Sequence, residues 1–179
     1  FDPREGKYHC TACQDCHQKY TLEQAEQRGW TCAECGKSIK KGVKDRIGEL
    51  ADGGDSPAWR PAYTHLVPLA EIIREVVGRS SVTTKTVQSI YDEFLDTFES
   101  EIQILIDQPI EELEEVNSRI ASAVQTFRNE DTIMVPGGGG KYGELIIPSD
   151  KEEKKRIEER RAAELDCRYE ETQTSLGDF

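Results

Sequence analysis

Apolar residues recur with the period of an α-helix over much of the chain between residues 68 and 128. Pro68 suits the start of a first predicted helix and Gly78 its end, a second helix follows, and Pro109 begins a third. These stripes predict a mainly helical domain. The apolar positions of the three predicted helices are Leu69, Ile72, Ile73, Val76 and Val77; Val87, Ile90, Tyr91, Phe94, Leu95 and Phe98; and Ile110, Leu113, Val116, Ile120, Val124 and Phe127.

Shorter patterns predict β-strands. Glu101–Ile106 alternates polar and apolar residues, which is typical of a half-buried strand. Thr132–Val135 and Glu144–Ile147 lie on either side of a glycine run, so they predict two short strands joined by a tight loop. The chain is therefore expected to combine helices and strands in an α+β fold.

Polar residues predict the remaining elements. Thr21 followed by Gln24 has the chemistry of a capping box, which predicts a short helix that ends near Gly29. Residues 37–50 are basic and lead into a short strand or helix. Residues 150–172 are charged throughout, which predicts either a solvated helix or a disordered tail.

The cysteines carry the most specific chemical signal. Five of the six lie within the first 35 residues, and two CxxC pairs, Cys13/Cys16 and Cys32/Cys35, are separated by 15 residues. Two tight turns that each aim two sulfurs inward supply the tetrahedral ligand set that zinc prefers. The spacing therefore predicts a small zinc ribbon with four cysteine ligands, in which the closed Zn²⁺ site is structural rather than catalytic.

The first pair can be drawn in two registers. Cys10 and Cys13 also form a CxxC pair, and His9 and His17 are close in sequence. We favour Cys13 and Cys16 as ligands, with Cys10 spare. The alternative to a metal site is a set of unliganded core cysteines, and Cys167 is interpreted as a bystander.

Charge is distributed unevenly along the chain. The net charge of −12 by itself argues against a nucleic-acid-binding protein. Residues 1–50, however, hold nine Lys and Arg against eight Asp and Glu, whereas residues 51–147 hold seven against seventeen. The acidity therefore lies outside the cysteine-rich part.

The ends and the apolar content bear on cellular context. The opening residues FDPREG contain neither an initiator Met nor a secretory signal, which predicts a piece of a longer cytoplasmic protein. Cysteines without such a signal favour metal binding over disulfides. No apolar run approaches the roughly 20 residues needed to span a bilayer, so no membrane partner is expected.

A basic segment follows the second cysteine pair and is a candidate for binding DNA phosphates. The alternative is an ordinary solvent-exposed surface. Asp45 is the acidic residue that opposes the positive charges of this segment. The candidate DNA-binding residues of this segment are Lys37, Lys40, Lys41, Lys44 and Arg46.

The glycine loop is not a Walker A motif, because Tyr142 follows Lys141 where Ser or Thr is required. The functional interpretation is that Gly138 and Gly139 permit close approach to a phosphate or base, with Lys141 supplying charge and Tyr142 stacking. The alternative is a flexible hairpin tip.

Two further segments contain candidate contact residues. Tyr63 and His65 could contact a DNA ligand, although such residues more often pack a domain junction. At the C-terminus, Gln173, Leu176 and Phe179 have the spacing of a sliding-clamp-binding peptide, which folds upon binding to an apolar pocket.

Several motifs together resemble the endonuclease Q family of PHP-domain DNA-repair endonucleases, known from archaea, over about residues 5–147. The motifs are Gly6-Lys7-Tyr8-His9, Cys13-x2-Cys16, Trp30-Thr31-Cys32-x2-Cys35-Gly36, Ile39-Lys40-Lys41-Gly42-Val43-Lys44-Asp45-Arg46, Pro61-x-Tyr63-x-His65-Leu66-x-Pro68, and the segment from Pro136 to Glu144. The resemblance also implies that Cys13 and Cys16 are the first ligand pair.

The resemblance implies a function for the parent protein. Members of the family join a PHP-type metallohydrolase domain to a zinc module and a helical C-terminal domain. They nick DNA on the 5′ side of deaminated bases, such as uracil and hypoxanthine, and at abasic sites, and some bind the sliding clamp. The metal cluster of the PHP domain has no counterpart among the three histidines here, so no catalytic residue is assigned.

Our interpretation is the damage-recognition and DNA-positioning part of such an enzyme, and the alternative is a stand-alone zinc-ribbon adaptor or regulator. The predicted division of the chain is a zinc-binding module (1–50), a linker (51–66), a mainly helical DNA-engaging domain (67–148), a charged tether (149–172) and a sliding-clamp-binding peptide (173–179).

Overall fold

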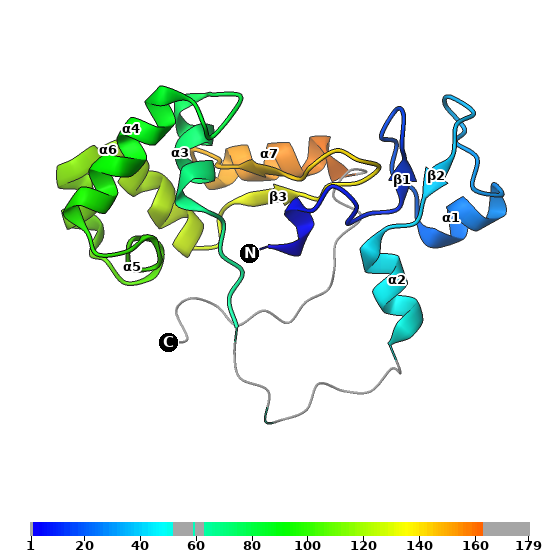
Figure 1. The fold of residues 1–179 in the computed structure, drawn as a ribbon, viewed down its shortest axis with the longest axis horizontal. Helices are drawn as coiled ribbons and strands as arrows, with labels where there is room; N and C mark the ends of the chain where they lie inside the picture. Colours follow the sequence, from blue (N-terminus) through cyan, green and yellow to red (C-terminus); the bar gives the residue numbers. More distant parts are fainter. Residues whose placement is uncertain (1, 52–58, 60–62, 163–179) are drawn as a thin grey trace.

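The computed structural model describes residues 2–51, 59 and 63–162. A cysteine-bearing module lies at one end of the long axis, a group of helices at the other, and a β-hairpin runs between them (Figure 1). The α+β class is confirmed. The elements are η1 (Pro3–Glu5), β1 (Ala12–Cys13), α1 (Leu22–Gln27), β2 (Ile39–Lys40), α2 (Val43–Leu50), α3 (Leu69–Val77), α4 (Lys85–Thr97), α5 (Glu101–Ile106), α6 (Ile110–Arg128), β3 (Ile133–Val135), β4 (Glu144–Ile146) and α7 (Lys151–Arg160).

The cysteine-bearing module consists of β1 paired antiparallel with β2, and α1 between them in sequence. The predicted capping box is present, because the Thr21 side chain accepts from the Gln24 N–H and the Gln24 side chain accepts from the Thr21 N–H. Ala25 of α1 is buried against the cysteines, together with Ile39. This core is small, so a metal ion is expected to contribute much of its stability.

The helical group is built on the predicted apolar stripes. Leu69, Ile72 and Ile73 of α3 are fully buried and pack in one cluster with residues of α4, α5 and α6. Burial of one such side chain contributes roughly 1.5–3 kcal/mol. Gly78 ends α3 in the left-handed region at φ 63°, and Pro68 precedes its first turn, as predicted.

Glu101–Ile106 is a helix, so the prediction of a strand there was wrong. The Ser100 side chain caps this helix by accepting from the Gln103 N–H. The Glu101 carboxylate accepts from the backbone N–H of Leu69 at 2.6 Å and from the Tyr91 hydroxyl at 3.1 Å. Six residues are too few for periodicity to separate strand from helix, and these tertiary contacts decide the outcome.

The third predicted helix contains a break that the periodicity did not reveal. Asn117, within α6, has φ −158° and ψ 105°, which are not helical values. Its side-chain oxygen accepts from the Ile120 N–H at 3.2 Å and thereby caps the second half of α6. Helical stripes on both sides of the break still face the common core.

The hairpin of β3 and β4 has a different neighbour on each face. Met134 and Leu145 join the helical core, whereas Ile133 and Val135 pack with Ile157 of α7, as the alternation of side chains along a strand requires. The charged segment is therefore helical at residues 151–160 and docked on the hairpin, rather than a free tether over its whole length.

Some predictions fall outside the described residues. They include most of the 51–66 linker, Cys167, and the clamp-peptide residues Gln173, Leu176 and Phe179. Within the described part of the chain, none of the helices combines the length and apolar character needed to cross a membrane.

Candidate metal centre and nucleic-acid interface

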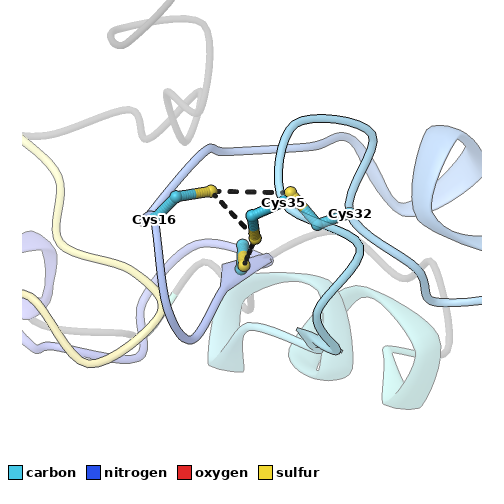
Figure 2. Close-up of side chains that lie close together, drawn as sticks. Cys16, Cys32 and Cys35 are labelled. Carbon is cyan, nitrogen blue, oxygen red and sulfur yellow. Dashed lines mark hydrogen bonds between the residues drawn. The ribbon is translucent and has the colours of Figure 1, made fainter.

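The four cysteines favoured as zinc ligands lie together in the structure. The Sγ atoms of Cys13, Cys16, Cys32 and Cys35 are all within 4.8 Å of one another. Specific separations are 3.4 Å for Cys13–Cys35, 3.5 Å for Cys16–Cys32 and 3.6 Å for Cys35–Cys16 (Figure 2). These distances are far longer than a disulfide bond of about 2.05 Å.

The sulfur geometry fits a tetrahedral metal ion. Zinc–sulfur bonds of about 2.3 Å in a tetrahedron place neighbouring sulfurs about 3.8 Å apart, close to the separations observed. Asp15 donates its backbone N–H to the sulfur of Cys13 at 3.4 Å, a contact that stabilises a thiolate. The donor set of four soft sulfurs is the one that structural zinc sites use.

Tyr20 contacts the same four-cysteine centre through its hydroxyl group. Its hydroxyl lies 3.1 Å from the sulfur of Cys32 and also accepts from the Ala33 N–H. The hydrogen bond from Tyr20 lowers the pKa of Cys32 to about 6. That hydrogen bond favours the thiolate of Cys32, which is the form that binds metal.

Cys10 lies outside the four-sulfur cluster, which favours the register chosen from the sequence. It is buried beside the glycine loop rather than beside the other sulfurs, and its backbone N–H donates to the carbonyl of Gly137 at 2.9 Å. His9 is buried as well, and His17 is turned towards the hairpin. Neither histidine belongs to the described metal-binding group.

The glycine loop between β3 and β4 is docked on the N-terminal segment, and is not a free hairpin tip. Its backbone amides donate to three carbonyls there: Gly137 to Arg4 at 2.8 Å, Gly140 to Lys7 at 2.9 Å and Gly143 to Glu5 at 2.8 Å. Figure 1 shows the yellow loop reaching from the helical end to β1. The close approach that the glycines permit is therefore to the protein's own backbone.

Gly139 makes the closest of these approaches. It has φ +62°, and a Cβ built on it would lie 2.1 Å from the carbonyl oxygen of Cys13. Its own carbonyl oxygen accepts from His17 Nδ1 at 3.2 Å, so His17 carries its proton on Nδ1. Gly138 and Gly139 are both buried, with Gly138 beside Cys10 and Ala12 and Gly139 beside Cys13.

The basic segment is less positive than its sequence suggests. Glu49, which the sequence interpretation overlooked, forms ion pairs with Lys41 and, at 2.9 Å, with Arg46. Lys41 also lies over the ring of Trp30, with its Nζ 5.2 Å from the ring centroid. Lys37 and Lys40 are exposed, whereas Lys44 is half-buried.

The remaining candidates fall into two groups. Tyr142 and Lys141 are exposed at the hairpin tip, and Lys7 Nζ lies 5.7 Å from the centroid of the Tyr142 ring. Tyr63 and His65 contact each other, with ring centroids 5.4 Å apart. The structure does not place this second pair with the first, since neither residue lines the hollows around Tyr142.

The half-buried carboxyl of Glu5 lies next to the docked loop, whose Gly143 donates to the Glu5 carbonyl. Burial, together with the nearby carboxylates of Asp2 and Glu71, raises the pKa of Glu5 from 4.5 to about 7. Between these two values the folded state holds more protons than the unfolded state, so the free energy of unfolding falls as pH rises.

Glu5→Gln is therefore expected to flatten the pH dependence of stability between about 4.5 and 7. The measurement is urea denaturation of both proteins at a series of pH values. Glu99→Gln, at an exposed position, is the matched control and should retain the wild-type slope. An unchanged slope in Glu5→Gln would contradict the assignment.

Comparisons with known proteins agree on one relationship. A family model described as the MJ0043 C-terminal domain matches residues 68–131. The uncharacterized protein MJ0043 of Methanocaldococcus jannaschii is 43% identical over 154 residues, which cover 86% of this chain and 20% of that protein. The crystal structure of the lesion-specific endonuclease PfuEndoQ from Pyrococcus furiosus matches with a TM-score of 0.75 and 52% identity, over 83% of this chain and 37% of that one.

The chain resembles the C-terminal part of endonuclease Q.

A second endonuclease Q structure, in complex with a 27-mer duplex substrate with an abasic lesion at the active site, gives a TM-score of 0.78 at 52% identity. It covers 83% of this chain and 38% of that one. The resemblance predicted from the sequence motifs is thus confirmed. The chain spans only a fifth to about two fifths of the length of these relatives.

Proposed function

We propose that this chain recognises and positions damaged DNA for the active site of an endonuclease Q-like enzyme that cuts on the 5′ side of deaminated bases or abasic sites. The catalytic PHP metallohydrolase domain would belong to another part of the parent protein. The observation that carries the proposal is the 52% identity to an endonuclease Q that was solved with a lesion-bearing duplex. Zinc bound by the four cysteines would organise the module and take no part in the chemistry.

The structure offers a physical basis for this role. The four-sulfur centre, the docked loop and the N-terminal segment are joined by hydrogen bonds, and together they present Lys141 and Tyr142 on one rigid surface. Ammonium groups suit phosphates and exposed aromatic rings suit bases. The exposed Tyr63 and the half-buried His65 form a second pair that is proposed to contact DNA separately.

The direct test is DNA binding by the whole chain. Affinity is measured for a duplex with one uracil or abasic site and for the same duplex without the lesion. We expect tighter binding to the damaged duplex, and we expect damage-dependent nicking only after the chain is fused to the preceding part of PfuEndoQ. The rival function, a zinc-ribbon adaptor that works through protein contacts, predicts no difference between the two duplexes.

The exposed lysines of the basic segment should contribute to phosphate binding. Lys37→Ala combined with Lys40→Ala is expected to lower the slope of log affinity against log salt by about 0.9 for each phosphate that the variant no longer neutralises. Lys85→Ala combined with Lys155→Ala, both outside the basic segment, is the charge-matched control and should keep the wild-type slope. Equal slopes for wild type and the double variant would remove Lys37 and Lys40 from the DNA interface.

We further propose that the C-terminal residues Gln173, Leu176 and Phe179 bind a sliding clamp. The basis is their spacing, since a single turn places Leu176 and Phe179 on one side. Titration of the whole chain with the clamp of its organism tests the idea, and Phe179→Ala should abolish the saturable binding. A clamp that fails to bind the wild-type chain would end this part of the proposal.

A further inference from the structure

Three hollows adjoin one exposed aromatic ring. Tyr142 is 68% exposed, and it lines cavities of about 460, 450 and 420 Å³. The largest lies between the metal-ligating turn and the docked hairpin, and we call it the turn–hairpin cavity. Its lining includes Cys16, His17, Lys19, Lys141, Tyr142 and Glu144.

The turn–hairpin cavity has a positive lining in an acidic protein. Lys19 enters from the module and Lys141 from the hairpin. Lys7 lines a neighbouring hollow, with its Nζ 5.7 Å from the centroid of the Tyr142 ring. Among the described lining residues Glu144 is the one carboxylate, and Arg161 forms an ion pair with it at 2.9 Å. Cations from two separate segments make the cavity suited to an anion.

The walls of the turn–hairpin cavity are held in place from both sides. The His17 ring bonds to the carbonyl of Gly139 across the gap, and the neighbouring Cys16 belongs to the four-sulfur centre. On the hairpin side, Gly138 and Lys141 exchange two backbone hydrogen bonds of 2.9 and 3.1 Å. A preformed cavity binds a ligand without the cost of ordering its own walls.

We propose that the turn–hairpin cavity binds a segment of single-stranded DNA, with a backbone phosphate between Lys19 and Lys141 and a base stacked on Tyr142. The pairing of a cationic hollow with an exposed ring is the combination by which proteins hold unpaired nucleotides. This inference rests on the proposed function, and it identifies the DNA form taken by this cavity. None of Lys7, His17 and Lys19 was singled out as a DNA contact by the sequence.

The test uses the whole chain and a thymidine tetranucleotide, with zinc content and circular dichroism confirming that each variant is folded. Lys19→Gln combined with Lys141→Gln should weaken binding about tenfold or more and lower its salt dependence. Tyr142→Leu should weaken binding by a similar factor with the salt dependence unchanged, because stacking is lost while charge is kept. Lys85→Gln combined with Lys155→Gln, both outside the cavity, is the charge-matched control and should bind like wild type.

Three results would overturn the inference: no binding of the tetranucleotide by wild type, equal binding by wild type and the cavity variants, or equal affinity for thymidine monophosphate. The last would show that the cavity takes a free nucleotide rather than a strand. These outcomes are separate from the proposed function, which depends on the preference of the wild-type chain for damaged over undamaged duplex. A chain that prefers damaged duplex and ignores the tetranucleotide keeps its proposed function and loses this cavity as a strand site.

Discussion

Gly139→Ala is expected to lower the free energy of unfolding by roughly 2–5 kcal/mol, because backbone strain and overpacking add at this position. The new Cβ would lie 2.1 Å from the Cys13 carbonyl oxygen and 2.9 Å from the Cys13 carbonyl carbon. Neither atom can move aside, since both belong to the backbone of β1 at a metal-ligating residue. The measurement is urea denaturation of the whole, zinc-loaded chain.

Gly78 provides a matched control for the conformational part of this effect. Its φ of +63° is nearly that of Gly139, but a Cβ there would meet nothing within 4 Å. Gly78→Ala should therefore cost only about 1–2 kcal/mol, the price of a left-handed alanine. Equal losses in the two variants would show that the contact between Gly139 and Cys13 yields easily, contrary to the structure.

Removal of zinc is expected to unfold the cysteine-bearing module, since structural zinc sites supply an apparent binding free energy of about 10–16 kcal/mol. The helical group should keep its circular dichroism, because its apolar cluster is separate from that of the cysteines. Nuclear magnetic resonance spectra after exhaustive chelation should lose dispersed signals from residues 10–40 while those of α3, α4 and α6 persist. A module that stays folded without metal would contradict the prediction.

Single cysteine variants identify the ligands independently. Cys16→Ser and Cys32→Ser should each lose bound zinc, because the cluster then lacks one sulfur. Cys10→Ser, at the cysteine outside the cluster, should retain one zinc per chain and is the matched control. Full zinc retention in Cys16→Ser would restore the rejected register of the first pair.

Local chemistry explains which elements could be predicted from the sequence. The capping box at Thr21 and the Gly78 stop depend on residues within one helical turn, and both are as expected. Glu101–Ile106 was wrong because the contacts that decide it, from Leu69 and Tyr91, come from other helices. The Asn117 break within α6 involves a local contact, the cap of the Ile120 N–H, but the apolar periodicity continues across it.

In the candidate site, too, features set by nearby residues could be predicted and features set by distant contacts could not. Spacing predicted two CxxC turns around one metal but left two registers for the first pair, and the structure groups Cys13 and Cys16 with the second pair. The docking of the glycine loop could not be predicted from the sequence, because its partners Arg4, Glu5 and Lys7 are separated from it by most of the chain. Glu49 was within reach of sequence reasoning, since it lies three residues beyond Arg46 on one helical face.

The contact between His17 and Gly139 joins positions 122 residues apart in sequence. Closing so long a loop is entropically costly, and chains dominated by distant pairings fold slowly. During synthesis the cysteine-bearing module leaves the ribosome before the β3–β4 hairpin has been made. We therefore expect the module to depend on metal for its stability at that stage, because the hairpin is not yet there to pack against it. We therefore expect the interface that holds Tyr142 in place to be among the last parts of the molecule to assemble.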